Sequence, residues 1–190
     1  MAAHLNVELK ARCADPARVR RVLEAAGADF RGTDAQRDVY FAVEDGRFKL
    51  RQGTIERSLV FYRRGDRAEA RRSEVTMARL EGLAPAALDA LEATLAAALG
   101  VRAVVEKRRE IRFVDHVKFH LDEVPGQGSF VEIEAIDLDG TIGEERLRAE
   151  CEAWRGRLGI AAGDVVAFSY ADAALERDSE PASSTPGRSS

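Results

Sequence analysis

The sequence predicts an α+β protein built on an antiparallel sheet of eight strands, arranged as a meander or a barrel. Apolar and charged residues alternate in eight separate runs, and short turn segments join several of them. Three further stretches break that alternation with apolar residues at helical spacing. Helices are therefore expected to flank the sheet.

The expected strands are the ranges 4–13, 36–43, 46–52, 57–64, 70–78, 101–113, 116–124 and 128–138. Gly46 follows Glu44-Asp45 and marks a tight hairpin, while Gly65-Asp66 and Pro125-Gly126 supply further turns. Short hairpins join antiparallel neighbours, so strands next to each other in the sequence are expected to pair.

Three long helices and one short helix are expected. The first begins at Asp15-Pro16, because aspartate is a preferred N-cap and proline suits the first helical position, and it closes at Gly27. The second covers 85–99 with one leucine stripe, which should pack against a sheet. The third covers 143–158, and a short helix is expected at 170–175. The apolar face of the third helix is Leu147, Cys151, Trp154 and Leu158.

The chain of 190 residues fits a single domain, expected over residues 1–176. Residues 177–190 read RDSEPASSTPGRSS and lack the branched and aromatic residues that a packed core requires, so a disordered tail is expected there.

The charge balance, the apolar runs and the cysteines indicate which partners, location and metal content to expect. With 29 Lys+Arg against 33 Asp+Glu, the net charge of -4 gives no reason to expect a nucleic-acid or membrane partner. The N-terminus has no apolar run as long as that of a signal peptide, and no apolar run in the chain is long enough to span a membrane. A cytoplasmic protein is therefore expected. Neither Cys13 nor Cys151 has a second cysteine or a histidine at metal-ligand spacing, so structural zinc is not expected. Both thiols are expected to be reduced.

Charged residues share strand faces, because side chains at i, i+2 and i+4 of a strand point the same way. The faces are Asn6, Glu8, Lys10 and Arg12; Arg47, Lys49 and Arg51; Lys107 and Arg109; Lys118, His120 and Asp122; and Glu132 and Glu134. One interpretation is an ordinary sheet with one face in water. The other is an enclosed site, since full charges concentrate on these faces with acids and bases on different strands.

Enclosed charges are unfavourable unless they are paired or meet a ligand. A polyphosphate requires several cations, and Mg²⁺ or Mn²⁺ requires carboxylate oxygens beside the phosphate. The candidate phosphate-binding residues are Lys49, Arg51, Lys107, Arg109 and Lys118. The candidate metal ligands are Glu8, Glu132 and Glu134, with Asp122 as a candidate for metal binding or proton handling.

Several segments together resemble the CYTH family, which contains class IV adenylate cyclases and thiamine triphosphatases. They are NVELKAR at 6–12, QRDVYF at 36–41, GRFKLR at 46–51, LVFYRRGD at 59–66, VVEKRREI at 104–111, VKFHLDEV at 117–124, GSFVEIE at 128–134 and SYADAAL at 169–175. The resemblance covers about residues 4 to 175, and it lies in the order and spacing of the segments more than in any one of them.

The resemblance implies a closed eight-stranded antiparallel barrel, the triphosphate tunnel, with metal-assisted chemistry inside it. The implied catalytic residues are Glu8, Lys10, Asp122, Glu132 and Glu134. The implied substrate-binding residues are Lys10, Lys49, Arg51, Arg64, Lys107, Arg109, Lys118 and His120, with His120 as a hydrogen-bonding wall residue rather than a metal ligand. Glu8, Glu132 and Glu134 are implied as ligands of Mg²⁺ or Mn²⁺.

The implied activity leaves alternatives open. The VKFHLDEV and GSFVEIE segments favour an adenylate cyclase-like protein that converts ATP to cyclic AMP and pyrophosphate. A triphosphatase acting on thiamine triphosphate or inorganic tripolyphosphate would use the same phosphate-binding residues. A non-catalytic polyphosphate- or nucleotide-binding module is the third interpretation. The resemblance also allows a homodimer.

One residue departs from the pattern of the family. The starting motif of the family is Glu-x-Glu-x-Lys, whereas this chain has Asn6, Glu8 and Lys10. Asparagine offers a neutral carbonyl oxygen and no charge, so one metal position is expected to be weaker or bound through water.

Overall fold

The computed structural model describes residues 4–64 and 70–179. Its strands are β1 (His4–Arg12), β2 (Asp29–Phe41), β3 (Arg47–Gly53), β4 (Arg57–Arg64), β5 (Arg71–Arg79), β6 (Val101–Val114), β7 (Val117–Val124) and β8 (Gly128–Asp137). Its helices are α1 (Pro16–Ala25), α2 (Pro85–Leu99), α3 (Glu144–Leu158) and α4 (Tyr170–Ser179), with a 3-10 turn at Ala162–Asp164.

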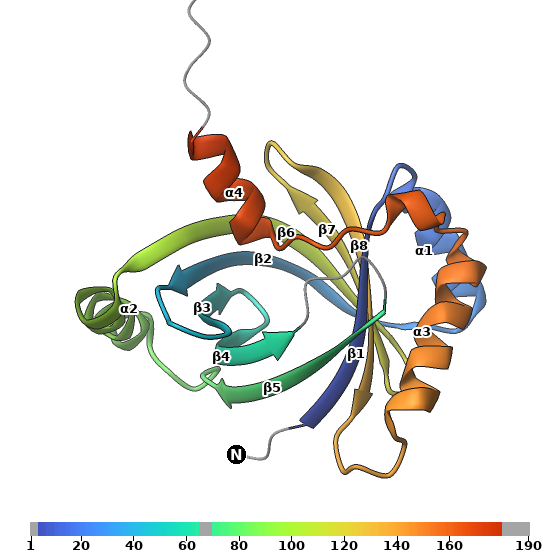
Figure 1. Ribbon diagram of the computed structural model, residues 1–190, viewed down its shortest axis with the longest axis horizontal. Coiled ribbons are helices and arrows are strands. Elements are labelled where there is room, and N and C mark those ends of the chain that lie inside the picture. Colours follow the sequence, from blue (N-terminus) through green and yellow to red (C-terminus); the bar gives the residue numbers. More distant parts are fainter. Residues whose placement is uncertain (1–3, 65–69, 180–190) are drawn as a thin grey trace, which may run out of the picture.

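The eight strands form a closed antiparallel barrel in the order β1-β5-β4-β3-β2-β6-β7-β8 (Figure 1). Neighbours in the sequence pair by hairpins, as expected, except where β1 inserts between β5 and β8 and β2 pairs with β6. The predicted fold class is confirmed, and the sheet is a barrel rather than an open meander.

The outside of β1 and β8 carries the main hydrophobic core. Val7, Leu9 and Ala11 of β1 are buried against α1 and α3, which lie together on this side of the barrel (Figure 1). The predicted apolar face of α3, from Leu147 to Leu158, is buried in the same cluster. Because the odd residues of β1 point outward to these helices, the even residues point into the barrel.

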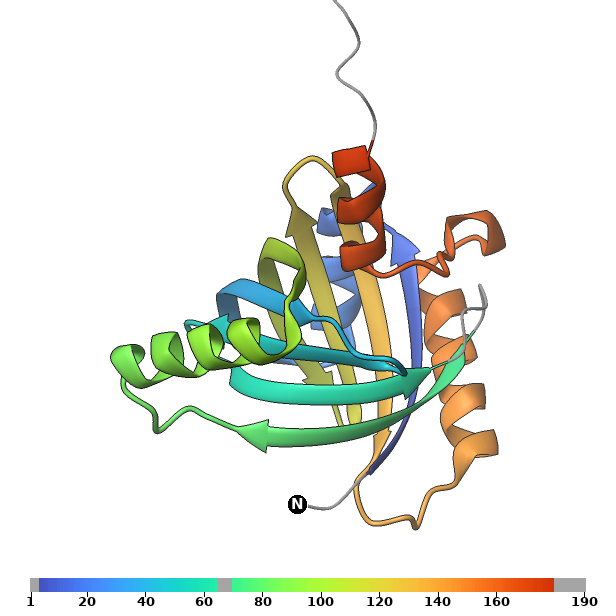
Figure 2. The same cartoon turned by 60° about the vertical axis from the view of Figure 1, so that its left-hand side comes forward.

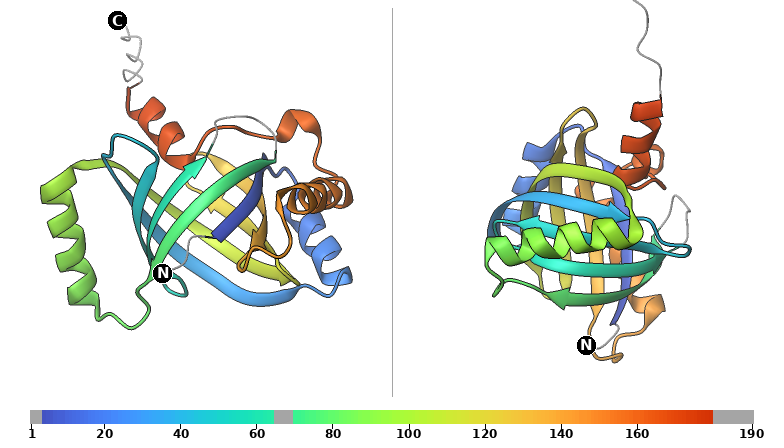
Figure 3. Two further views of the ribbon diagram at one scale, coloured as in Figure 1. Left: turned by 60° about the horizontal axis from the view of Figure 1, so that its bottom comes forward. Right: turned by 90° about the vertical axis from the view of Figure 1, so that its left-hand side faces the viewer.

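The remaining helices lie elsewhere on the barrel. Helix α2 lies on the side opposite α1 and α3, where Leu91 and Leu95 pack against Phe41 and Leu50 (Figure 3). Helix α4 stands at one end of the barrel, beside the turn between β7 and β8 (Figure 2). Among the described residues, no helix combines the length and the apolar character that crossing a membrane requires.

Two boundaries differ from the sequence-based expectation by more than two residues. Strand β2 starts at Asp29, seven residues before the expected start at residue 36, because it pairs with β6 along this length despite its polar sequence and a bulge near Gly32. Helix α4 runs to Ser179 rather than to residue 175, so it includes three residues of the expected tail. The rest of that tail, 180–190, lies outside the described residues.

Candidate active site in the barrel tunnel

A cavity of about 690 Å³ occupies the barrel interior and is lined by residues from all eight strands. The charged strand faces therefore point into the barrel, except at Arg12, which is exposed, and Arg47, which pairs with Asp172 and does not line the cavity. The predicted site residues that line this cavity are Glu8, Lys10, Lys49, Arg51, Lys107, Arg109, Lys118, His120, Glu132 and Glu134. Asp122 is buried beside them, whereas Arg64 ends β4 with its side chain outside the described part of the chain.

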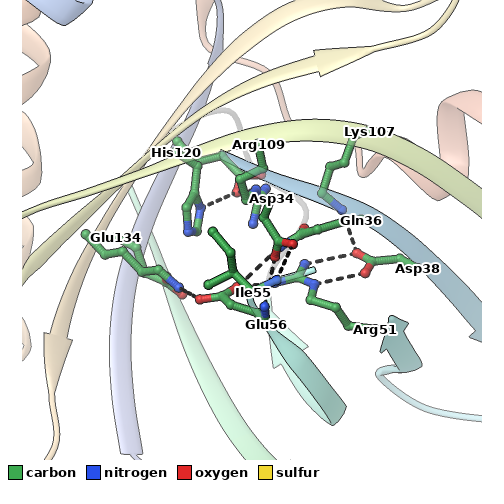
Figure 4. A network of polar contacts seen from close by, with 12 residues as sticks. Asp34, Gln36, Asp38, Arg51, Ile55, Glu56, Lys107, Arg109, His120 and Glu134 are labelled. Atoms are coloured by element: carbon green, nitrogen blue, oxygen red, sulfur yellow. Dashed lines mark hydrogen bonds and ion pairs between the residues drawn. The ribbon is translucent and has the colours of Figure 1, made fainter. Parts of the chain in front are cut away.

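One wall of the tunnel is organised around Asp38, whose side chain is fully buried in β2 (Figure 4). Its carboxylate accepts two hydrogen bonds of 2.9 Å from Arg51, one of 3.0 Å from Lys49 and one of 2.7 Å from Lys107. Burial alone would raise the pKa of Asp38, but Arg51, Lys107 and Lys49 hold it well below its usual value. We call these four residues the Asp38 cluster.

Lys107 is the member of the Asp38 cluster whose pKa is shifted close to neutral pH. Burial lowers its pKa to about 7, and Arg51 and Arg109 contribute in the same direction although Asp38 opposes them. The ammonium group is therefore close to its titration point at neutral pH, and a bound anion would favour its charged form.

A second set of contacts converges on Glu132 of β8. Its carboxylate lies 2.8 Å from Lys10 Nζ, 2.7 Å from Arg109 Nη2 and 3.0 Å from His120 Nδ1. Lys10 and Arg109 hold the pKa of Glu132 well below its usual value, in spite of burial. Burial lowers the pKa of His120 to about 3, so the ring is neutral at pH 7 and is assigned as donating from Nδ1 to the carboxylate.

Asp122 takes part in the same network as a partner of Arg109. Arg109 Nε and Nη2 lie 2.6 and 2.5 Å from the Asp122 carboxylate, and the Tyr170 hydroxyl donates to Asp122 at 2.8 Å. Arg109 holds the pKa of Asp122 below its usual value against the effect of burial. The structure therefore shows Asp122 orienting an arginine, and its role in metal binding or proton handling stays a prediction.

The acidic side of the tunnel lies where β1 pairs with β8. Glu8 stands opposite Glu134 in the register of the two strands, and the amide of Asn6 donates to Glu134 at 2.8 Å. Burial raises the pKa of Glu134, and the carboxylates of Glu8 and Glu132 add to this. Crowded acids of this kind are stabilised by a cation.

These carboxylates fit a divalent cation by charge and by chemistry, since hard ions prefer carboxylate oxygens. Within residues 4–64 and 70–179, however, no three His, Cys, Asp or Glu side chains are arranged around one ion position. Glu132 faces Lys10 and Arg109, so Glu8 and Glu134 are the first candidates for metal ligands.

Four functional-site residues were missed by the sequence reasoning: Asp34, Asp38, Glu56 and Tyr170. Asp38 lies on the inward face of β2 inside the quoted QRDVYF segment, so the parity argument applied to β2 could have found it. Tyr170 lies in the quoted SYADAAL segment, but its sequence gives no sign that it reaches the tunnel.

Glu56 enters the tunnel from the loop between β3 and β4, where it lies 2.5 Å from Lys118 and 3.1 Å from Arg51. The buried Asp34 holds this loop, because it accepts hydrogen bonds from the backbone of Ile55 and Glu56 (Figure 4). The loop approaches Asp34 closely at Gly53, where a Cβ atom would lie 2.6 Å from a carboxylate oxygen. No strand pattern could have predicted this contact.

The closed antiparallel barrel, with acidic and basic side chains buried in its interior, defines a protein of the triphosphate-tunnel fold. The CYTH domain matches residues 4–170 of the chain, which therefore belongs to the CYTH family. No curated protein matches the chain.

Solved structures with the same fold cover nearly the whole chain. The PH1012 protein of Pyrococcus horikoshii OT3 is 26% identical with a TM-score of 0.69, covering 88% of this chain and 98% of its own. An adenylate cyclase-like protein of Vibrio parahaemolyticus is 20% identical with a TM-score of 0.71, covering 92% and 99%. The adenylyl cyclase-like protein HpAC1 of Hippeastrum, described with a dominant triphosphatase activity, is 15% identical with a TM-score of 0.57, covering 95% and 98%.

Proposed function

We propose that this protein is a metal-dependent enzyme that acts on a triphosphate, converting ATP to cyclic AMP and pyrophosphate. The observation that carries the proposal is the division of the tunnel wall. Cations of β3 and β6 gather around Asp38 on one wall, while Glu8 and Glu134 crowd together where β1 meets β8. A triphosphate with a divalent cation matches both sets of charges.

In this mechanism the cations orient the phosphate chain and stabilise the charge that develops on it. Lys49, Arg51 and Lys107 bind phosphate oxygens in place of part of their contact with Asp38, and Arg109 and Lys10 do so from the Glu132 side. CYTH enzymes generally depend on a divalent metal ion. Bound at Glu8 and Glu134, Mg²⁺ or Mn²⁺ would neutralise phosphate charge and polarise the phosphorus centre.

The apolar side chains of the cavity support an organic substrate. Met77, Ile111, Phe113 and Ile136 line the tunnel toward its end at the start of β1 and the end of β6. Inorganic tripolyphosphate has no group that would use such a surface, whereas a nucleobase would.

The attacking oxygen separates this activity from triphosphate hydrolysis. A ribose hydroxyl that attacks the α-phosphorus yields the cyclic nucleotide, and water that attacks the terminal phosphorus yields orthophosphate. Hydrolysis is the second candidate, because the Hippeastrum relative shares the fold and is described as chiefly a triphosphatase.

The test incubates the purified protein with ATP, thiamine triphosphate or inorganic tripolyphosphate, each with Mg²⁺ or Mn²⁺. Cyclic AMP with pyrophosphate is the expected product, measured by chromatography. Release of orthophosphate without cyclic AMP would show that the protein is a triphosphatase and not a cyclase. Binding of tripolyphosphate without turnover of any substrate would indicate a non-catalytic binding module.

Replacing Asn6 with glutamate is expected to raise the affinity for Mg²⁺ or Mn²⁺. The Asn6 amide now donates to Glu134, and a third carboxylate at this position would add negative charge beside Glu8 and Glu134. A calorimetric metal titration of the Asn6→Glu variant measures the change, with Asn6→Gln as the uncharged control. Equal titrations for wild type and Asn6→Glu would show that position 6 does not contact the ion.

Tripolyphosphate binding near pH 7 is expected to take up protons through Lys107. Because its pKa is lowered to about 7, Lys107 is about half protonated in the protein without ligand. A bound anion raises this pKa, so Lys107 takes up protons when the complex forms. Calorimetry in two phosphate-free buffers of different ionisation enthalpy counts these protons. The Lys107→Met variant should take up fewer protons than wild type, and an unchanged number would assign the uptake to the ligand alone.

A further inference from the structure

Tyr170 is the first residue of α4, yet its side chain is only 3% exposed and lines the tunnel cavity. The helix stands outside the barrel, at the end beside the β7–β8 turn (Figure 2). Tyr170 therefore brings a C-terminal side chain into contact with the charged interior.

The Tyr170 ring supports Lys10 directly. Lys10 Nζ lies 3.5 Å from the ring centroid, and it also pairs with the Glu132 carboxylate at 2.8 Å. Phe130 meets the tyrosine ring edge-on at 5.1 Å between centroids, which fixes the plane of the ring. An aromatic face holds an ammonium group at this distance by the cation–π attraction.

The Tyr170 hydroxyl acts on a second cation through Asp122. It donates to Asp122 Oδ2, and the same carboxylate pairs with Nε and Nη2 of Arg109. One side chain thus fixes Lys10 through its ring and Arg109 through its hydroxyl.

We propose that Tyr170 is a positioning residue that sets Lys10 and Arg109 in the geometry that binds the triphosphate. The proposal rests on the proposed function in one respect, namely that these two cations contact phosphate. It goes beyond that function by assigning the C-terminal helix a part in substrate binding.

A merely structural role for Tyr170 would be to attach α4 to the barrel, but other groups already provide this attachment. Asp172 pairs with Arg47 at 2.9 Å, and Gln127 donates to the backbone carbonyl of Tyr170 at 3.1 Å. The backbone of Val166 donates to that of Lys10 at 2.9 Å. None of these contacts uses the tyrosine ring or its hydroxyl, so α4 should remain docked in a Tyr170→Phe variant.

The test compares Tyr170→Leu, Tyr170→Phe and the control Phe168→Leu in calorimetric titrations with inorganic tripolyphosphate in the presence of EDTA. The control removes a ring that packs on Phe130 with centroids 6.2 Å apart, in the segment just before α4. Tyr170→Leu should weaken binding by about tenfold, the size of an enclosed cation–π contact. Tyr170→Phe should lie between this variant and wild type because it keeps the ring, and the control should stay within about twofold.

One further measurement separates positioning from docking and from failure of the proposed function. Ring currents of Tyr170 should shift the Lys10 Hε resonances upfield in wild type and Tyr170→Phe, but not in Tyr170→Leu. If wild type binds no tripolyphosphate, the proposed function fails, and this shift alone decides whether Tyr170 positions Lys10. Equal binding by Tyr170→Leu and wild type, or equal losses in Tyr170→Leu and Phe168→Leu, would overturn the inference.

Discussion

Replacing Asp38 with alanine is expected to lower the free energy of unfolding by about 3–5 kcal/mol, because it leaves buried cations without their counter-ion. Lys49, Arg51 and Lys107 all contact this one carboxylate, and Asp38 itself is fully buried. Urea unfolding followed by circular dichroism measures the loss. The matched control is Asp45→Ala, because the pair of Asp45 with Arg63 is exposed to solvent and its loss should leave the unfolding curve nearly unchanged.

The same Asp38→Ala variant should be stabilised by tripolyphosphate more strongly than wild type is. In wild type the anion competes with Asp38 for the three cations, whereas in the variant it restores the missing negative charge. Thermal unfolding with and without tripolyphosphate compares the two proteins. Equal stabilisation of both would show that the anion does not bind at the Asp38 cluster.

Replacing Glu134 with glutamine is expected to reduce metal-dependent turnover by about 10²–10³-fold, the usual effect of losing one electrostatic contribution to the transition state. Glu134 is the carboxylate whose pKa is raised beside Glu8 and Glu132, and Asn6 is its hydrogen-bond donor. Glutamine fills nearly the same volume and removes one charge from a crowded acidic group. The fold should therefore survive with unchanged or increased stability.

The measurement for Glu134 is kcat as a function of Mg²⁺ or Mn²⁺ concentration on the substrate that wild type turns over. Glu132→Gln is the comparison, because Glu132 pairs with Lys10 and Arg109 and its loss leaves both cations less well compensated. That variant should lose stability as well as activity, while Glu134→Gln loses activity alone. Full activity of Glu134→Gln would remove Glu134 from the metal site.

The sequence predicted most of the barrel because alternation and turn residues are local properties of each strand. All eight strands and all four helices were expected. Parity placed Lys49 with Arg51 on one strand face, and the resemblance to the CYTH family implied that such charged faces point inward, as they do. The first part of β2 was missed, because its strand conformation comes from pairing with β6 and not from its own composition.

The pairing of charges inside the tunnel could not be predicted in the same way. Parity shows which side chains share a face, but which carboxylate meets which cation depends on how strands far apart in the sequence come together. Asp38 and Lys107 are 69 residues apart, and Tyr170 reaches Asp122 from a helix outside the sheet. The resemblance to the CYTH family supplied the barrel closure, and the structure supplied these partners.

Closure of the barrel through β1 has a consequence for how the protein folds. The strand synthesised first pairs with β5 and with β8, and the hydrogen bond from Asn6 to Glu134 spans 128 residues. Contacts of such high contact order form late, since a long loop must close before they contribute. A nascent chain can pair one edge of β1 with β5 once residue 79 has been made, but the other edge of β1 stays unpaired until residue 137 has been made. The acidic end of the tunnel then assembles together with the final seam of the barrel, so a truncated or partly folded chain carries no competent site.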